Sequence, residues 1–232
     1  MRHLPQSQFK SMPWKNGGGE TIEILNNPDG AGLDDFQWRI SMARVAQDGA
    51  FSNFPQIDRH LAVLDGDRMD LIIDGKPACR LTPESQAFSF AGDVPVEAVL
   101  GQGPITDLNV MVRRGAWLAT LERVDLQTPQ AWQGAGDLAV IYVSQGDVQC
   151  VSKGTEMRVP CGDAIRIEHA DGPVSLQPHG HCRIWRVELQ AIKGANRRGR
   201  GQKGRQFATA NARMIPPCCA RRIIQSDPAQ VM

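Results

Sequence analysis

The stretch Gln37-Trp38-Arg39-Ile40-Ser41-Met42-Ala43 decides the fold class. Apolar and polar residues alternate along it, and successive side chains of a β-strand point to opposite faces. The alternation therefore predicts a half-buried strand over residues 37–43. No segment in the first half of the chain has a long helical period, and residues 1–190 consist of short strand patterns broken by turns. The chain is therefore predicted to be all-β.

Further strands are predicted on both sides of this stretch. Apolar runs at 61–64 and 69–73 are separated by Asp65-Gly66-Asp67, which indicates a hairpin, and Asp74-Gly75-Lys76-Pro77 indicates a second turn. Strands are also predicted at 21–25, 87–90 and 108–112. Residues 43–54 contain too many turn formers to be assigned.

The same order of segments recurs in the second half. Leu138-Ala139-Val140 repeats Leu61-Ala62-Val63 after 77 residues, and Pro160-Cys161-Gly162-Asp163 repeats Phe90-Ala91-Gly92-Asp93 after 70 residues. A turn of the form Pro-x-Gly-Asp is typical of cupin barrels. The prediction is a bicupin-like fold of two fused β-barrel or jelly-roll repeats, residues 1–115 and 116–190, followed by a tail at 191–232.

Charge divides the chain unevenly. Residues 1–190 carry 17 basic and 24 acidic residues, a net charge of −7, whereas residues 191–232 carry nine and one, a net charge of +8. The acidic body argues against nucleic acid as its main partner. The basic tail has no apolar period and is predicted to be disordered. It is either an arm that binds nucleic acid or an anionic surface, or a non-native extension.

Apolar segments bear on the location. No run approaches the roughly 18 apolar residues of a membrane-spanning helix, and residues 1–10 lack the apolar core of a secretory signal. A cytoplasmic protein without membrane contact is therefore predicted. The six cysteines form no C-x-x-C pair, and four of them (Cys79, Cys150, Cys161 and Cys182) are interpreted as packed side chains. Sheet edges of such a fold would permit a homodimer.

One block is distinctive: Met12-Pro13-Trp14-Lys15-Asn16-Gly17-Gly18-Gly19-Glu20-Thr21. It lacks the spacing of a phosphate-binding loop, and it closely resembles the opening of the HutD/Ves family. Three further segments resemble the same family, at residues 38–45, 48–59 and 92–115. The resemblance spans about residues 12–189 and is strongest in the first half.

The resemblance implies a bicupin-like fold and a link to histidine utilisation. HutD members are thought to bind a small pathway metabolite, such as urocanate or formylglutamate, and to moderate pathway activity. Ves members are associated with cold and stress. These segments do not distinguish a HutD-like protein from a Ves-like protein.

Candidate contacts for such a carboxylate are basic, amide and hydroxyl side chains in the family-like segments. On the strand at 107–113, Asp107, Asn109, Met111 and Arg113 share one face, opposite an apolar face. A turn after Phe54-Pro55 is expected to place Arg59 at a barrel mouth. Arginine can hold a carboxylate with two hydrogen bonds. The predicted ligand-binding residues are Lys15, Asn16, Arg39, Ser41, Arg59 and Asn109.

Other chemistries lack a motif. Metal-binding cupins carry His-x-His followed by Glu, whereas the matching region, Asp58-Arg59-His60-Leu61, has one histidine, which is interpreted as a structural hydrogen-bonding group. His179-Gly180-His181 has the pair spacing but no clear third ligand. No nucleophile motif occurs, so no catalytic residue, metal or cofactor is predicted. The alternatives are a cupin enzyme (an isomerase or hydrolase) acting on a small anionic substrate, with Asp58, His60 or Asp107 as acid–base groups, and an interaction protein with a filled interior.

Overall fold

The computed structural model describes residues 1–14 and 17–193, and these form β-strands with two 3-10 turns, η1 (Gln6–Gln8) and η2 (His169–Asp171), and no α-helix. The predicted all-β class is confirmed. Residues 15–16 and the basic tail from residue 194 lie outside the described residues. No helix in the described part is long and apolar enough to cross a membrane.

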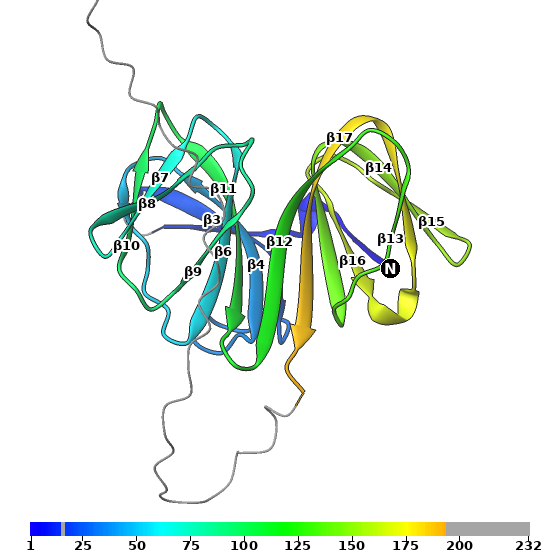
Figure 1. Ribbon diagram of the computed structural model, residues 1–232, viewed down its shortest axis with the longest axis horizontal. Helices are drawn as coiled ribbons and strands as arrows, with labels where there is room; N and C mark the ends of the chain where they lie inside the picture. Colours follow the sequence, from blue (N-terminus) through cyan, green and yellow to red (C-terminus); the bar gives the residue numbers. More distant parts are fainter. Residues whose placement is uncertain (15–16, 194–232) are drawn as a thin grey trace, which may run out of the picture. The chain divides into compact units, whose positions relative to one another are not determined.

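The first half of the protein, β2 to β11, contains two sheets (Figure 1). The six-stranded sheet has the order β2 (Lys10–Pro13), β3 (Gly19–Asn27), β4 (Trp38–Val45), β11 (Ile105–Arg113), β6 (Ile57–Asp65) and β9 (Phe88–Ala91). The four-stranded sheet has the order β5 (Gly49–Ala50), β10 (Val96–Leu100), β7 (Met69–Ile73) and β8 (Lys76–Leu81). Leu61 and Val63 of the first sheet pack with Met69 and Leu71 of the second, so an interior core lies between the sheets.

The second half consists of β1 and β12 to β17 in one seven-stranded sheet. Its order is β1 (Arg2–Leu4), β16 (Ala164–Glu168), β14 (Leu138–Ser152), β17 (Val174–Ala191) and β12 (Trp117–Leu126), with β13 (Gln130–Trp132) on β17 and β15 (Thr155–Val159) on β14. The pairing of β14 with β17 is interrupted between Val143 and Asp147. Residues before and after this bulge belong to one apolar cluster, so the sheet bends around its own core.

Strand order is the same in the two halves. In the first half β4, β11, β6 and β9 are neighbours in that order, and in the second half β12, β17, β14 and β16 are. Among the described residues no sheet closes on itself, so the predicted closed barrels are not confirmed. The N-terminal strand β1 pairs with β16 of the second half, whereas the first repeat was predicted to begin at residue 1.

Most predicted strands lie within observed ones, but one predicted hairpin is wrong. Asp74-Gly75 does join the paired strands β7 and β8. Gly66, with a positive φ, instead connects β6 to β7, which belong to different sheets. A turn motif reports a local reversal of the chain, and whether the flanking strands then pair depends on the sheet that each one joins.

The two faces of β11 meet different surroundings. Leu108, Val110 and Val112 pack against Trp185 and Val187 of the second half. The opposite face, which carries Asp107, Asn109 and Met111, is also buried and faces the interior of the first half. Burial on both sides explains why polar residues on this strand must find partners inside the protein.

Candidate binding site

Polar side chains lie in two neighbouring cross-strand rows on the inner face of the six-stranded sheet. Register places Met111 between Arg39 on β4 and Arg59 on β6. The neighbouring row is centred on Asn109, which lies two residues from Met111 on β11 and is flanked by Ser41 on β4 and Leu61 on β6. Glu23 on β3 lies next to Ser41 and is the outer member of this row. Asp107 lies two residues further along β11, between Ala43 and Val63. We call these polar residues the interior cluster: Glu23, Arg39, Ser41, Arg59, Asp107 and Asn109.

Arg39 has a fixed partner within the cluster. Its Nε donates to Glu23 Oε2 at 2.7 Å, and both side chains are largely buried. A close pair of opposite charges offsets part of the cost of removing both groups from water. The positive charge of Arg39 is therefore balanced by Glu23.

Arg59 lacks such a partner. It is 4% exposed, and its Nε donates to the Asn109 Oδ1 at 3.4 Å. No carboxylate in the described part of the chain lies within ion-pair distance of its guanidinium. Burial lowers the pKa of Arg59 to about 10, an effect that Asp107 opposes and Arg39 adds to. At neutral pH the interior therefore holds a charged, unpaired guanidinium.

Three aromatic rings surround this guanidinium. The Arg59 Cζ lies 4.6 Å from the ring centre of Phe51, 5.9 Å from that of Phe54 and 5.2 Å from that of Phe90. The negative faces of aromatic rings attract a cation without neutralising it. The cage therefore stabilises and orients the guanidinium while leaving its charge available to an anion.

Asp107 lies two residues from Asn109 on the same face of β11. Its side chain is 2% exposed, and Oδ1 has no hydrogen-bond partner in the described residues. Burial raises the pKa of Asp107 to about 7, while Arg59 and the backbone of Ala43 act to lower it. This carboxyl group is therefore close to half-ionised at neutral pH.

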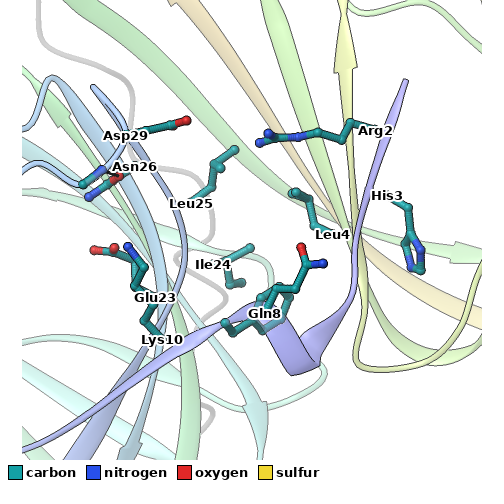
Figure 2. A pocket seen from close by; sticks show the side chains of 12 residues that line it. Arg2, His3, Leu4, Gln8, Lys10, Glu23, Ile24, Leu25, Asn26 and Asp29 are labelled. Atoms are coloured by element: carbon teal, nitrogen blue, oxygen red, sulfur yellow. Dashed lines mark hydrogen bonds between the residues drawn. The ribbon is translucent and has the colours of Figure 1, made fainter.

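A hollow lies between the N-terminal arm (residues 1–13) and β3, and Glu23 of the interior cluster is among the residues that line it. It is a cavity of about 240 Å³ with Leu4 and Ile24 among its apolar lining. Figure 2 shows Arg2 and Asp29 facing one another from opposite walls. Both of these side chains are solvent-exposed, so their charges are screened. Neither this cavity nor a smaller one beside Trp132 is lined by Arg59, Asp107 or Asn109. The interior cluster is the candidate site on the strength of its buried charge alone, because charge there is screened far less.

The sequence of this chain matches a known protein family. A family model described as HutD matches residues 6–185. The chain belongs to the HutD family. An uncharacterised 21.2 kDa protein in the hutC 3′ region of Pseudomonas putida is 35% identical over 187 residues, which cover 80% of this chain and 95% of the relative. The protein Ves of Cronobacter sakazakii is 38% identical over 149 residues, which cover 62% and 78%.

Solved structures agree with this HutD-family assignment. A conserved protein of unknown function from Pseudomonas aeruginosa PAO1 has a TM-score of 0.76 at 32% identity, covering 82% of this chain and 98% of that one. HutD from Pseudomonas fluorescens SBW25 (formate condition) has a TM-score of 0.69 at 29% identity, with the same coverage. A cupin barrel protein from Leptotrichia buccalis has a TM-score of 0.52 at 9% identity, which shows a cupin-like fold alone.

Four of the six predicted contacts of this HutD-family protein come together in the interior cluster: Arg39, Ser41, Arg59 and Asn109. Lys15 and Asn16 lie outside the described residues. The position of Arg59 at a barrel mouth stays a prediction, because no sheet closes among the described residues; Arg59 is the third residue of β6 and is almost fully buried. Arg39, one of these predicted contacts, has its charge balanced by Glu23.

Several partners were not predicted. No pattern in the sequence pointed to Glu23. The spacing Phe51-x-x-Phe54 could have indicated the aromatic rings around Arg59, and the alternation of Asp107 with Asn109 could have indicated the carboxyl group of Asp107. Arg113 shares their strand face but donates to the backbone oxygens of Asp34 and Phe36, so it holds a loop.

Histidine and metal chemistry find no support at the cluster. His60 Nδ1 lies 2.7 Å from Ser89 Oγ, which fits the predicted structural role. His179 and His181 are exposed and flank Gly180, which has a positive φ. No group of three His, Cys, Asp or Glu side chains within the described ranges is arranged to hold a metal ion. The residues that the structure describes do not fit a cupin metal site.

Proposed function

We propose that this protein binds a small carboxylate metabolite inside its first half and moderates histidine utilisation without catalysing a reaction. The fold that carries the site is proposed to be a bicupin of two jelly-roll repeats, which the matching strand orders support. Urocanate and formylglutamate are the first candidate ligands, since the chain is a HutD-family, cupin-like protein linked to histidine utilisation.

One observation carries the proposal: the guanidinium of Arg59 is buried, charged and without a carboxylate partner in the described residues. A buried charge without a partner is costly, so proteins retain one where a function uses it. The planar guanidinium matches a carboxylate in shape and donates two parallel hydrogen bonds to it. Formate, the smallest carboxylate, is named in the description of the HutD structure from Pseudomonas fluorescens.

Neighbouring groups fit this role. Asn109 accepts from the Arg59 Nε and so fixes the orientation of the guanidinium, while the remaining N–H groups are available to a ligand. Because Arg59 is almost fully covered, with the rings of Phe51 and Phe54 against its guanidinium, binding of a ligand requires groups around Arg59 to move. Closure of the rings over the bound anion would exclude water and strengthen the electrostatic attraction.

The test is calorimetric titration of the full chain with formate, urocanate and formylglutamate, together with thermal unfolding. A ligand at 100 times its dissociation constant adds about 2.7 kcal/mol of stability, which raises the unfolding midpoint by roughly 5–10 °C for a body of this size. Binding is expected to be lost in Arg59→Met, which keeps an apolar stem within the cage, and weakened in Arg59→Lys.

The matched control is Arg44→Met, which removes an exposed arginine on β4 and should leave binding unchanged. Equal binding by wild type and Arg59→Met, or no binding of any carboxylate, would overturn the proposed function.

A second candidate function is a cupin enzyme acting on a small anionic substrate. Asp107 favours it, because its pKa of about 7 is suited to proton transfer near neutral pH. Incubation of the protein with candidate substrates, followed by NMR, tests this reading. Turnover that Asp107→Asn abolishes would support an enzyme, and unchanged substrates would count against it.

A further inference from the structure

The starting observation is the unpaired oxygen of Asp107. Oδ1 is fully covered and has no hydrogen-bond donor among the described residues. Its cross-strand neighbours on the same face are Ala43 and Val63, whose side chains cannot donate a hydrogen bond. Buried polar atoms in folded proteins are rarely left unpaired, so each one calls for an explanation. Asp107 Oδ1 is one of four such side-chain atoms in the described residues, and the one that lies in the interior cluster.

Asp107 is close to Arg59 within the interior cluster. Arg59 projects from the row of Met111 but reaches Asn109, one step along β11 towards Asp107. Successive residues on one strand face are roughly 7 Å apart. Asp107 acts to raise the pKa of Arg59, and Arg59 acts to lower the pKa of Asp107. A ligand held by the guanidinium would therefore have Asp107 beside it.

We propose that Asp107 determines ligand specificity by accepting a hydrogen bond from an N–H group next to the ligand's carboxylate. This inference rests on the proposed function, since Arg59 holds the carboxylate. Asp107 has an acceptor oxygen whether or not it carries a proton. The favoured class is a carboxylic acid with a neighbouring amide, pyrrole or imidazole N–H group.

The physical reason for selection is the asymmetry of buried hydrogen bonds. A ligand that lacks the N–H group leaves Oδ1 unpaired in the complex, while the competing N–H ligand pairs it. A site built to hydrogen-bond one ligand group rejects an analogue without it far better than an apolar pocket rejects a change in size. Arg59 alone would bind both analogues equally, so any preference reports on the second contact.

The experiment compares two acids of nearly the same shape, pyrrole-2-carboxylate and furan-2-carboxylate, by calorimetric titration of the full chain at pH 8. They differ in a ring N–H against a ring oxygen. The wild type is expected to bind the pyrrole acid at least about tenfold more tightly, which corresponds to about 1.4 kcal/mol. In Asp107→Leu the ratio is expected to fall to about one, with binding still dependent on Arg59. Arg44→Met is expected to keep the wild-type ratio.

The outcomes separate the two proposals. Equal Arg59-dependent affinities of the wild type for both acids would overturn the role of Asp107 and leave the proposed function standing. A preference that survives in Asp107→Leu would also overturn it. Failure of formate and of both acids to bind would overturn the proposed function and this inference with it. Asp107→Leu should fold, because the neighbouring Ala43 and Val63 side chains are apolar, and thermal unfolding checks this.

Discussion

Replacing Asp107 by Asn is expected to stabilise the unliganded protein, and the gain should grow with pH. Burial raises the pKa of Asp107 from 3.8 to about 7 in the folded protein. Below about pH 3 the carboxyl group is largely protonated in both the folded and the unfolded state. Between pH 4 and 7 the folded protein retains a proton that the unfolded chain has lost, so wild-type stability falls as the pH rises.

The size of the effect follows from the shift. Each pKa unit corresponds to about 1.4 kcal/mol, so a shift of about three units costs the wild type about 4 kcal/mol above pH 7. Asparagine has nearly the shape of a protonated aspartate and cannot ionise. The stability advantage of Asp107→Asn is therefore expected to rise from near zero at about pH 3 to about 4 kcal/mol at pH 8.

Urea unfolding of both proteins at pH 5, 6, 7 and 8 measures this difference. Between pH 5 and pH 8 the gap in unfolding free energy should widen by about 2–3 kcal/mol, which moves the midpoint by about 1 M urea. Asp29→Asn, at an exposed position, is the control and should follow the wild type at each pH. Parallel curves for wild type and Asp107→Asn would refute the reasoning that burial dominates the ionisation of Asp107.

Three further predictions concern the stability that individual ion pairs contribute to the folded protein. Arg39→Met should cost about 3 kcal/mol of stability, because it leaves the largely buried Glu23 carboxylate unpaired. The double variant Arg39→Met with Glu23→Leu should recover most of this loss. Urea unfolding that shows no recovery would contradict the pairing. Asp163→Ala should cost about 2 kcal/mol of stability, since its buried carboxylate accepts hydrogen bonds from the His3 ring and the backbone N–H of Gln6. His3→Ala removes only one of these bonds and should cost about half as much, as measured by thermal unfolding. Equal losses in the two variants would show that the backbone hydrogen bond contributes nothing. Arg114→Ala should cost only about 1 kcal/mol, because its two ion pairs are partly solvated at 35% side-chain exposure. Amide exchange should quicken at the start of β6 and around Asp93, whose oxygen atoms Arg114 binds. Unchanged exchange would show that Arg114 does not hold these segments.

Strand content could be predicted from the sequence because alternation of apolar and polar residues is a local property. Residues 37–43 fall almost entirely within β4, and residues 69–73 coincide with β7. Sheet membership could not be predicted in the same way. The turn at Gly66 looks like a hairpin turn, yet β6 joins the six-stranded sheet and β7 the four-stranded sheet. Which strands pair depends on contacts between distant residues, and the turn does not encode them.

For the candidate site, the sequence by itself determined which residue types were available: an arginine, a serine and an amide at alternating strand positions in family-like segments. It also determined that Asp107 shares a face with Asn109, because strand side chains alternate. Only the tertiary structure decided how the charges are used. Glu23 reaches Arg39 from a third strand and neutralises it, while the rings of Phe51, Phe54 and Phe90 enclose Arg59 without pairing it. The free charge at Arg59 and the unpaired oxygen of Asp107 arise because burial and pairing are set by residues brought together from different strands.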